Sequence, residues 1–136
     1  ELQIIEIIGV FIWLTGFAGE TIADEQLKKF KNDPGNKGKT CDTGLWYYSR
    51  HPNYFFETLG WLAYPLLAID LTGAYLWGFA ALLAPACMYW LLVHVSGIPM
   101  LEEKMIESRG EAYRAYQKAT SAFFPLPPKS LDSQAK

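Results

Sequence analysis

The sequence predicts an all-α fold, a polytopic transmembrane helical bundle with about three membrane helices in this chain, followed by a C-terminal amphipathic helix at the membrane interface. Three observations predict it: long apolar stretches, cationic residues confined to two segments, and no alternating strand and helix pattern. We expect one membrane domain over residues 1–129 and a disordered tail over residues 130–136. The net charge of -2 gives no reason to expect a nucleic-acid partner.

The longest apolar stretch covers residues 71–101, which contain no Asp, Glu, Lys or Arg. A bilayer core about 30 Å thick needs about 20 residues of helix. Residues 75–95 meet that need, and a membrane helix tolerates Pro85 as a kink. A buried helix of a soluble protein is the alternative, and the length of the run favours the membrane.

Two further stretches precede it. Residues 2–18 hold only Gln3 and Glu6 as strongly polar positions and indicate a membrane helix cut short at its N-terminus, with partner helices expected upstream. Residues 54–69 are a weaker candidate for a membrane helix because they hold Glu57. Only a short connection, residues 70–73, separates them from the long apolar stretch. The sequence therefore predicts a helical hairpin.

The cationic residues indicate the orientation. All 12 Lys and Arg residues lie either between residues 20 and 52 or after residue 101. The positive-inside rule then places the long 20–52 loop and the tail on the cytoplasmic side. The tail begins with Pro99 and predicts an amphipathic helix, with Gly110 as its weak point.

The candidate binding residues lie between positions 24 and 57. Asn53 and Glu57 are one helical turn apart, and an amide beside a carboxylate at the membrane edge suits the carboxamide and ribose of a nicotinamide cofactor. Lys28 and Lys31 are also one turn apart and could face a phosphate, with Lys39 and Arg50 adding to the positive field.

Each of these residues has a structural alternative. The lysines fit a positive-inside anchor, His51 followed by Pro52 fits a helix start, and Trp46 fits an interfacial aromatic belt. The two cysteines, Cys41 and Cys87, are expected to be free thiols, and no residue spacing indicates a metal site.

Residues 44–57, with the sequence GLWYYSRHPNYFFE, carry a resemblance to a known family. With residues 20–24, residues 96–102 and the tail, they resemble the DUF1295 / 3-oxo-5-alpha-steroid 4-dehydrogenase C-terminal domain family of steroid reductase-like membrane proteins. The resemblance implies an NADPH-dependent reductase whose cofactor enters from the cytoplasm. The cofactor-binding positions that it implies are Asp24, Lys28, Lys31, Lys39, Trp46, Arg50, His51, Asn53, Tyr54 and Glu57.

Two departures from the family pattern bear on the site. Arg occupies the positions of Lys28, Lys31 and Lys39 in the steroid reductases, and Lys keeps the charge without the bidentate fork. Many relatives carry Gly at the position of Phe56, which would change the shape of the pocket.

The resemblance implies hydride transfer to an activated C=C bond of a lipid or steroid-like substrate. The Tyr and Glu that polarise the carbonyl in steroid reductases belong to earlier helices, so no catalytic residue is assigned and we expect this chain alone to be inactive. Isoprenylcysteine carboxyl methyltransferases share an Arg-His-Pro-x-Tyr stretch and a paired-Glu tail, here Glu102 and Glu103, and would imply S-adenosylmethionine. A non-catalytic membrane protein of the same fold is the third alternative.

Overall fold

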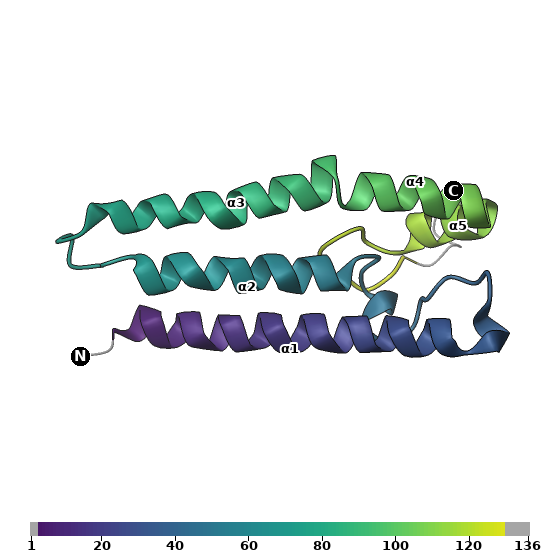
Figure 1. Cartoon of the computed structure of the whole chain (residues 1–136), viewed down its shortest axis with the longest axis horizontal. Coiled ribbons are helices and arrows are strands. Elements are labelled where there is room, and N and C mark those ends of the chain that lie inside the picture. The colour runs from purple at the N-terminus through teal and green to yellow at the C-terminus, as the bar shows by residue number, and fades with distance from the viewer. Residues whose placement is uncertain (1–2, 130–136) are drawn as a thin grey trace.

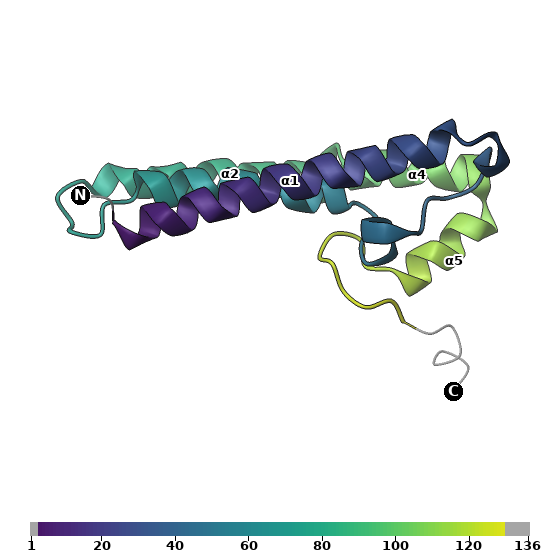
Figure 2. The same cartoon turned by 90° about the horizontal axis from the view of Figure 1, so that it is seen from below.

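The computed structural model describes residues 3–129, so the predicted disordered tail at 130–136 lies outside the described residues. The described part is helical and holds no strand, which confirms the all-α prediction. Figure 1 shows α1, α2 and α3 side by side as three long rows, with α4 continuing the third row. In the view of Figure 2, α5 and the segment after it lie to one side of these rows. The elements are α1 (Ile4–Asn32), η1 (Pro34–Asn36), η2 (Gly44–Tyr47), α2 (Pro52–Ala68), η3 (Leu76–Leu82), α3 (Leu83–Trp90), η4 (Leu91–Val95), α4 (Ile98–Arg109) and α5 (Glu111–Ala119).

The first helix is longer than its apolar stretch. α1 runs for 29 residues and ends at Asn32, so residues 20–32 are helical and the predicted long loop is wrong over that part. The reason is local: these residues are mostly good helix formers, and the first strong breaker is Pro34, which disfavours helical geometry at Asp33. Lys29 and Lys31 in the last turn also suit the negative end of the helix dipole.

Small residues let α1 and α2 approach closely. A Cβ added at Gly16 would lie 2.7 Å from the backbone nitrogen of Gly60, so the two backbones touch at this point. At Gly19 an added Cβ would collide with the ring of Phe56. Glycine and alanine at such positions are typical of helix pairs in membranes, where packing rather than water drives association.

The predicted hairpin of the second and third stretches is present, and α2 packs against η3 and α3. The third segment is helical across residues 76–95 but is not one regular α-helix. It begins as 3₁₀, becomes α at Leu83, and widens to a π turn over Leu91–Val95. Pro85 is the third residue of α3, where an α-helix leaves backbone N–H groups without α-helical partners.

A break at Ser96 and Gly97 separates this segment from α4. The carbonyl of Leu91 accepts hydrogen bonds from the backbone nitrogens of both residues, at 2.9 and 3.3 Å. The predicted single C-terminal helix is in fact two, because the chain turns at Gly110 with φ of 58°, a conformation that L-residues with a side chain rarely adopt. α4 is therefore an extension of the third row, and α5 folds back beside the loop before α2.

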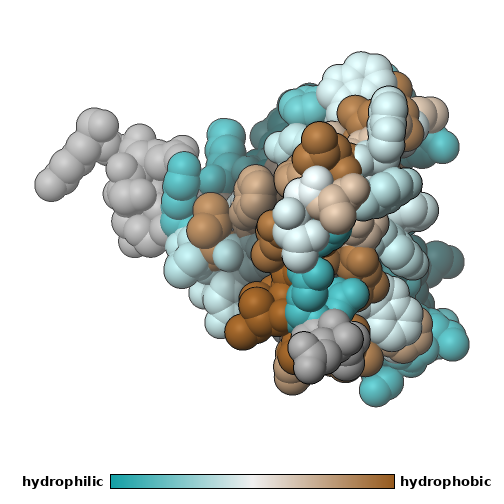
Figure 3. All heavy atoms as spheres, turned by 90° about the vertical axis from the view of Figure 1, so that its left-hand side faces the viewer, coloured by the Kyte–Doolittle hydropathy of each residue, from teal (hydrophilic) through white to brown (hydrophobic). Residues whose placement is uncertain are grey.

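Two helical stretches of the described residues are long and apolar enough to cross a membrane, Ile4–Asn32 and the segment Leu76–Arg109, whose apolar part precedes the break at Gly97. Only 17% and 11% of their apolar windows are buried, whereas the core helix of a soluble protein is mostly buried. Large apolar side chains such as Trp77, Ile4 and Leu83 are 78%, 74% and 72% exposed. Hydrophobic residues also reach the surface at the end of the bundle seen in Figure 3.

The contact between α1 and α2 gives a matched test. We expect Gly16→Ala to destabilise the protein by roughly 1–3 kcal/mol, because the new methyl group meets backbone atoms that cannot move aside. Gly60→Ala should be neutral or stabilising, since no atom lies within 4 Å of its added Cβ and alanine favours the helix. Unfolding of both variants in the same detergent measures the difference, and equal effects would contradict the close approach.

Candidate functional site

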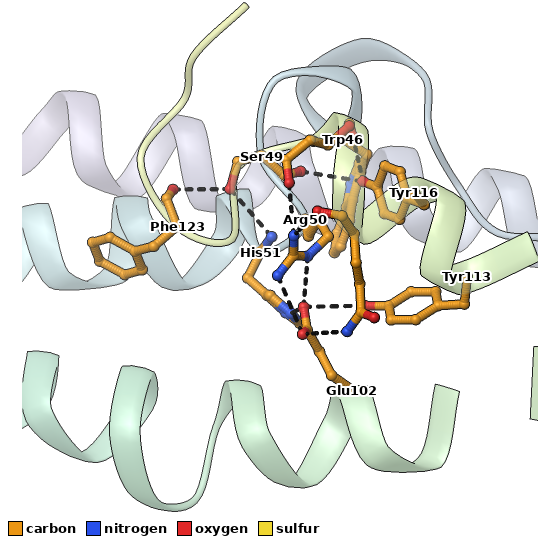
Figure 4. Close-up of polar contacts among 10 residues, drawn as sticks. Trp46, Ser49, Arg50, His51, Glu102, Tyr113, Tyr116 and Phe123 are labelled. Atoms are coloured by element: carbon orange, nitrogen blue, oxygen red, sulfur yellow. Dashed lines mark hydrogen bonds and ion pairs between the residues drawn. The ribbon is translucent and has the colours of Figure 1, made fainter. Parts of the chain in front are cut away.

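A buried carboxylate joins three parts of the chain. Glu102 of α4 is 8% exposed and points toward the loop that precedes α2, as Figure 4 shows. Its oxygen Oε1 accepts hydrogen bonds from Arg50 Nε at 2.7 Å and from Tyr113 Oη at 3.3 Å, and lies 3.0 Å from His51 Nε2. Its Oε2 accepts from Gln117 Nε2 at 2.8 Å and from the Arg50 guanidinium at 3.2 Å.

Most of the N–H donors of Arg50 take part in this network. Beside its two bonds to Glu102, it donates to the backbone carbonyls of Gln117 and Thr120 at 2.8 and 2.7 Å, which lie at the end of α5. A guanidinium has five N–H donors, and four are engaged here. Arg50 therefore holds α5 onto α4, and its charge is matched by Glu102.

The surroundings of Glu102 stabilise its charge. Burial opposes ionisation, but hydrogen bonds from His51 and Arg50, the Arg50 charge and the Gln117 amide outweigh it and lower the pKa of Glu102 to about 2. Burial raises the pKa of Tyr113, and the adjacent Glu102 charge raises it further. The glutamate is thus a fixed anion and the tyrosine a fixed hydroxyl donor near neutral pH. Both lie beyond the break at Gly97, outside the apolar run.

The loop before α2 is fixed from several sides. Trp46 is buried, and its indole nitrogen donates to the carbonyl of Ala23 in α1 at 2.9 Å. Ser49 donates its hydroxyl to the carbonyl of Phe123 at 2.8 Å, and Tyr116 donates to the carbonyl of Trp46. These bonds connect the loop to α1, to α5 and to the C-terminal segment, which leaves it little freedom.

A cavity of about 440 Å³ lies beside this network, between the end of α1, the 36–41 loop, α4 and α5. Its lining includes five cationic side chains and no carboxylate: Lys31, Lys37, Lys39, Arg50 and Arg109. Leu27, Phe30, Trp46 and Met105 supply apolar surface. A cavity of this size and mixed lining is typical of small-molecule and cofactor sites.

Two polar atoms of the cavity wall have no partner within residues 3–129. They are Thr40 Oγ1 and Asn53 Oδ1, and both are buried. The amide nitrogen of Asn53 donates one of its two N–H groups to Asp24 at 3.2 Å, which leaves one N–H without a partner in the described part of the chain. Buried polar atoms normally have partners, so these two are exceptions within a wall that is otherwise satisfied.

Six of the ten predicted binding residues line this cavity: Lys31, Lys39, Trp46, Arg50, His51 and Asn53. The other four, Asp24, Lys28, Tyr54 and Glu57, do not. Glu57 instead lines a separate hollow of about 210 Å³ with Glu20, on the α1–α2 surface. The expectation that Asn53 and Glu57 face one cavity is therefore wrong, because one turn along α2 changes which neighbouring elements the side chain meets.

Local contacts explain why other predicted binding residues do not line the cavity. Lys28 is 69% exposed at its side chain and lies 3.8 Å from Glu25, so it does not face a phosphate site together with Lys31. Tyr54 stacks its ring on His51 with centroids 5.5 Å apart. His51 itself precedes the first residue of α2, Pro52, which confirms the alternative of a helix start. Within residues 3–129, no group of three His, Cys, Asp or Glu side chains is placed to hold a metal.

Sequence reasoning missed several residues of the site. Glu102 entered only as part of the paired-Glu tail of the methyltransferase alternative, and Lys37, Arg109 and Tyr113 received no role. One feature of the sequence could have indicated the role of Glu102. It is the first charged residue after the charge-free stretch, and an acid next to a membrane segment needs a polar partner. Arg109 reaches the cavity through α4, and its Nε donates to the carbonyl of Lys39 at 3.1 Å, a contact across 70 residues that no local pattern indicates.

Glu102 and its exposed neighbour Glu103 form a matched pair for a stability test. The folded-state pKa of Glu102 is about 2, below the usual 4.5, so its contribution is complete above pH 4.5 and is lost as the pH falls toward 2. That shift corresponds to roughly 3 kcal/mol. Glu102→Gln should cost about that much at pH 7, because Arg50 is left buried without its counterion.

Denaturant unfolding in detergent, followed between pH 7 and pH 2, measures both effects. Glu102→Gln should flatten the loss of stability below pH 4.5, whereas Glu103→Gln should leave both the stability and the acid limb unchanged. The same acid limb in all three proteins would contradict the role of this carboxylate.

The sequence model of a family described as a protein of unknown function, DUF1295, matches residues 1–120. An uncharacterized protein of Schizosaccharomyces pombe is 38% identical over 103 residues, which make up 71% of this chain and 27% of that protein, so the chain spans about a quarter of the relative. No solved structure matches the chain. The family match covers the helices, the cationic cavity and the Glu102 network alike, and the chain belongs to the DUF1295 family.

Proposed function

We propose that this chain forms the cofactor-binding part of a membrane-embedded NADPH-dependent reductase that acts on a C=C bond of a lipid or steroid-like substrate. The observation that carries the proposal is the cavity lined by cationic side chains without a carboxylate. Arg50 is neutralised by Glu102, and Lys31, Lys37, Lys39 and Arg109 remain to face an anion. Such a field favours a ligand with several phosphates.

The remaining lining fits the rest of a dinucleotide. Asn53 and Thr40 place an amide and a hydroxyl in the cavity lining, and such groups can hydrogen-bond the nicotinamide amide and a phosphate or ribose oxygen. Phe30 and Trp46 offer aromatic faces for the flat rings. When bound, NADPH supplies a hydride, and this chain's residues bind and orient it and exclude water around it.

The membrane arrangement is part of the proposal. We infer that α1, the α2 helix and the third row cross the bilayer, with residues 70–73 on the outer side. The cavity and both clusters of Lys and Arg then lie together at the cytoplasmic end, where the positive-inside rule expects them. A soluble cofactor would reach the cavity from the cytoplasm, and an apolar substrate would reach the bundle from the lipid.

The two alternatives predict different ligands. S-adenosylmethionine carries a positive sulfonium and no phosphate, so four unneutralised cations in the lining disfavour it. A buried Glu102 bound to Arg50 and His51 does match the Arg-His-Pro-x-Tyr stretch and paired Glu of the methyltransferases. A non-catalytic protein would bind neither small molecule.

Thermal shift with purified protein in detergent separates these outcomes. NADPH at 100 times its dissociation constant should stabilise the protein by about 2.7 kcal/mol through mass action, with a smaller effect of NADH at equal concentration. A shift with S-adenosylmethionine and none with NADPH would replace the reductase proposal by the methyltransferase. No shift with either would leave the non-catalytic alternative.

Lys31 and Lys28 provide a matched pair on the same helix. Lys31→Gln should weaken NADPH binding by about 1.5–3 kcal/mol, that is tenfold or more, because it removes a charge from the cavity wall. Lys28→Gln removes an equal charge one turn away, outside the cavity, and should change the affinity less than threefold. Equal losses would show that only the general positive field matters.

Asn53 and Asp24 separate a direct contact from an indirect one. Asn53→Ala should weaken NADPH binding by roughly 1–3 kcal/mol because it removes the amide group that Asn53 contributes to the cavity lining. Asp24→Ala removes only the partner of the amide nitrogen and should have a smaller effect. If both variants lose the same affinity in a titration, Asn53 acts through Asp24 and not on the ligand.

A further inference from the structure

The segment that follows α5, residues 120–128, contains no charged side chain. It runs back from the end of α5 toward the start of α2. In Figures 1 and 2 this yellow segment lies nearer than α5 to the end of the rows where α2 connects to η3. If the rows cross a bilayer, the segment is therefore closer to the hydrocarbon than α5 is.

Backbone hydrogen bonds fix the segment against the loop before α2. The amide of Arg50 donates to the carbonyl of Ser121 at 2.8 Å, and the amide of Leu126 donates to the carbonyl of Tyr48 at 3.0 Å. Between these two bonds the ring of Phe123 is buried. The segment thus has a defined conformation, and the side chains that stay exposed on it are placed there by the fold.

Three large side chains of this region face outward. Phe124 and Leu126 are each 54% exposed, and Tyr48, which is bonded to Leu126 through its carbonyl, is 45% exposed. The ring of Phe124 lies 6.0 Å from that of Phe55 in α2, so the exposed surface continues the apolar flank of the bundle. Tyr48, Phe124 and Leu126 are here called the apolar edge. Exposed apolar patches that are continuous in this way mark interaction surfaces.

The helix that the sequence places at the membrane interface does not offer such a surface. Tyr113 of α5 is buried, and Tyr116 donates its hydroxyl to the carbonyl of Trp46, so both aromatic side chains pack inside the protein. The exposed positions of α5 are small or charged: Glu111, Ala112, Arg114, Ala115 and Lys118. These side chains suit water, and the apolar contact is left to the edge beside the helix.

The charges around the edge favour a lipid surface as what covers it. Lys118 precedes the charge-free segment and Lys129 follows it, and both are exposed. The amide of Lys129 donates to the carbonyl of Ala119 at 2.8 Å, which brings the two ends of the segment together. Two cations at the border of an apolar surface match the phosphates of lipid headgroups above their acyl chains.

From these observations we infer that the apolar edge inserts into the cytoplasmic interface of the bilayer. Phe124 and Leu126 lie at the boundary of the acyl chains, and the hydroxyl of Tyr48 lies among the headgroups, the level that tyrosine prefers. The contact anchors the loop before α2, whose Arg50 and His51 line the cationic cavity. The inference rests on the membrane arrangement given with the proposed function, and it does not depend on the identity of the cofactor.

The test measures depth in the bilayer with spin labels. The full chain, with Cys41→Ala and Cys87→Ala, is placed in nanodiscs of phosphatidylcholine and phosphatidylglycerol without any nucleotide. A nitroxide is attached at Leu126→Cys, and in separate samples at Phe124→Cys, at Ala115→Cys on the exposed side of α5, and at Leu83→Cys on the third row. Paramagnetic resonance then compares collisions with oxygen, which concentrates in hydrocarbon, and with a water-soluble nickel complex.

We expect the ratio of oxygen to nickel collisions to be severalfold higher at positions 124 and 126 than at the matched position 115, and highest at position 83. Equal ratios at 115, 124 and 126 would overturn the inference. Protection of 124 and 126 from both reagents would also overturn it, because protein and not lipid would then cover the edge.

Position 83 separates this inference from the larger proposal. Nickel access at position 83 would overturn the membrane arrangement together with the inserted edge, whereas a lipid-exposed position 83 with a water-exposed position 126 would overturn the edge alone. Because no nucleotide is present, neither result depends on the NADPH titration.

Discussion

The ion pair between Arg50 and Glu102 connects elements that otherwise share few contacts. Arg50 ends the loop before α2, Glu102 lies one turn into α4, and the guanidinium also binds the carbonyls at the end of α5. Two charges with this little exposure are costly to bury apart, so the native arrangement is the one that keeps them together. The position of α5, and with it one wall of the cationic cavity, follows from that requirement.

The same constraint explains why the cavity stays positive. Glu102 neutralises Arg50 and accepts from Tyr113 and Gln117, so the acid is turned away from the ligand space. Lys31 at the end of α1 and Lys37 and Lys39 of the 36–41 loop form no ion pair in the described part of the chain and line the cavity. The carboxylate of Glu102 therefore stabilises the packing of the loop, α4 and α5, whereas the cationic side chains without an ion pair remain available to bind an anion.

Close packing of α1 on α2 gives the other half of the framework. Gly16 brings the two backbones into contact, and Gly19 provides the space that the ring of Phe56 occupies. Phe56 therefore packs against the surface of α1 and does not line the cationic cavity. The cationic cavity is lined by none of the residues of this contact.

The sequence by itself determined the all-helical fold, the hairpin, the helix start at Pro52 and six of the residues that line the cavity, because helical periodicity, proline positions and clustered lysines are local properties. It did not reveal the helical extension to Asn32, the division at Gly110, the separation of Asn53 from Glu57 or the burial of Glu102. Only the tertiary structure decided these, since the environment of a side chain depends on which distant elements pack beside it. Arg50 and Glu102 are 52 residues apart, and neither residue's own neighbours indicate that the two charges meet.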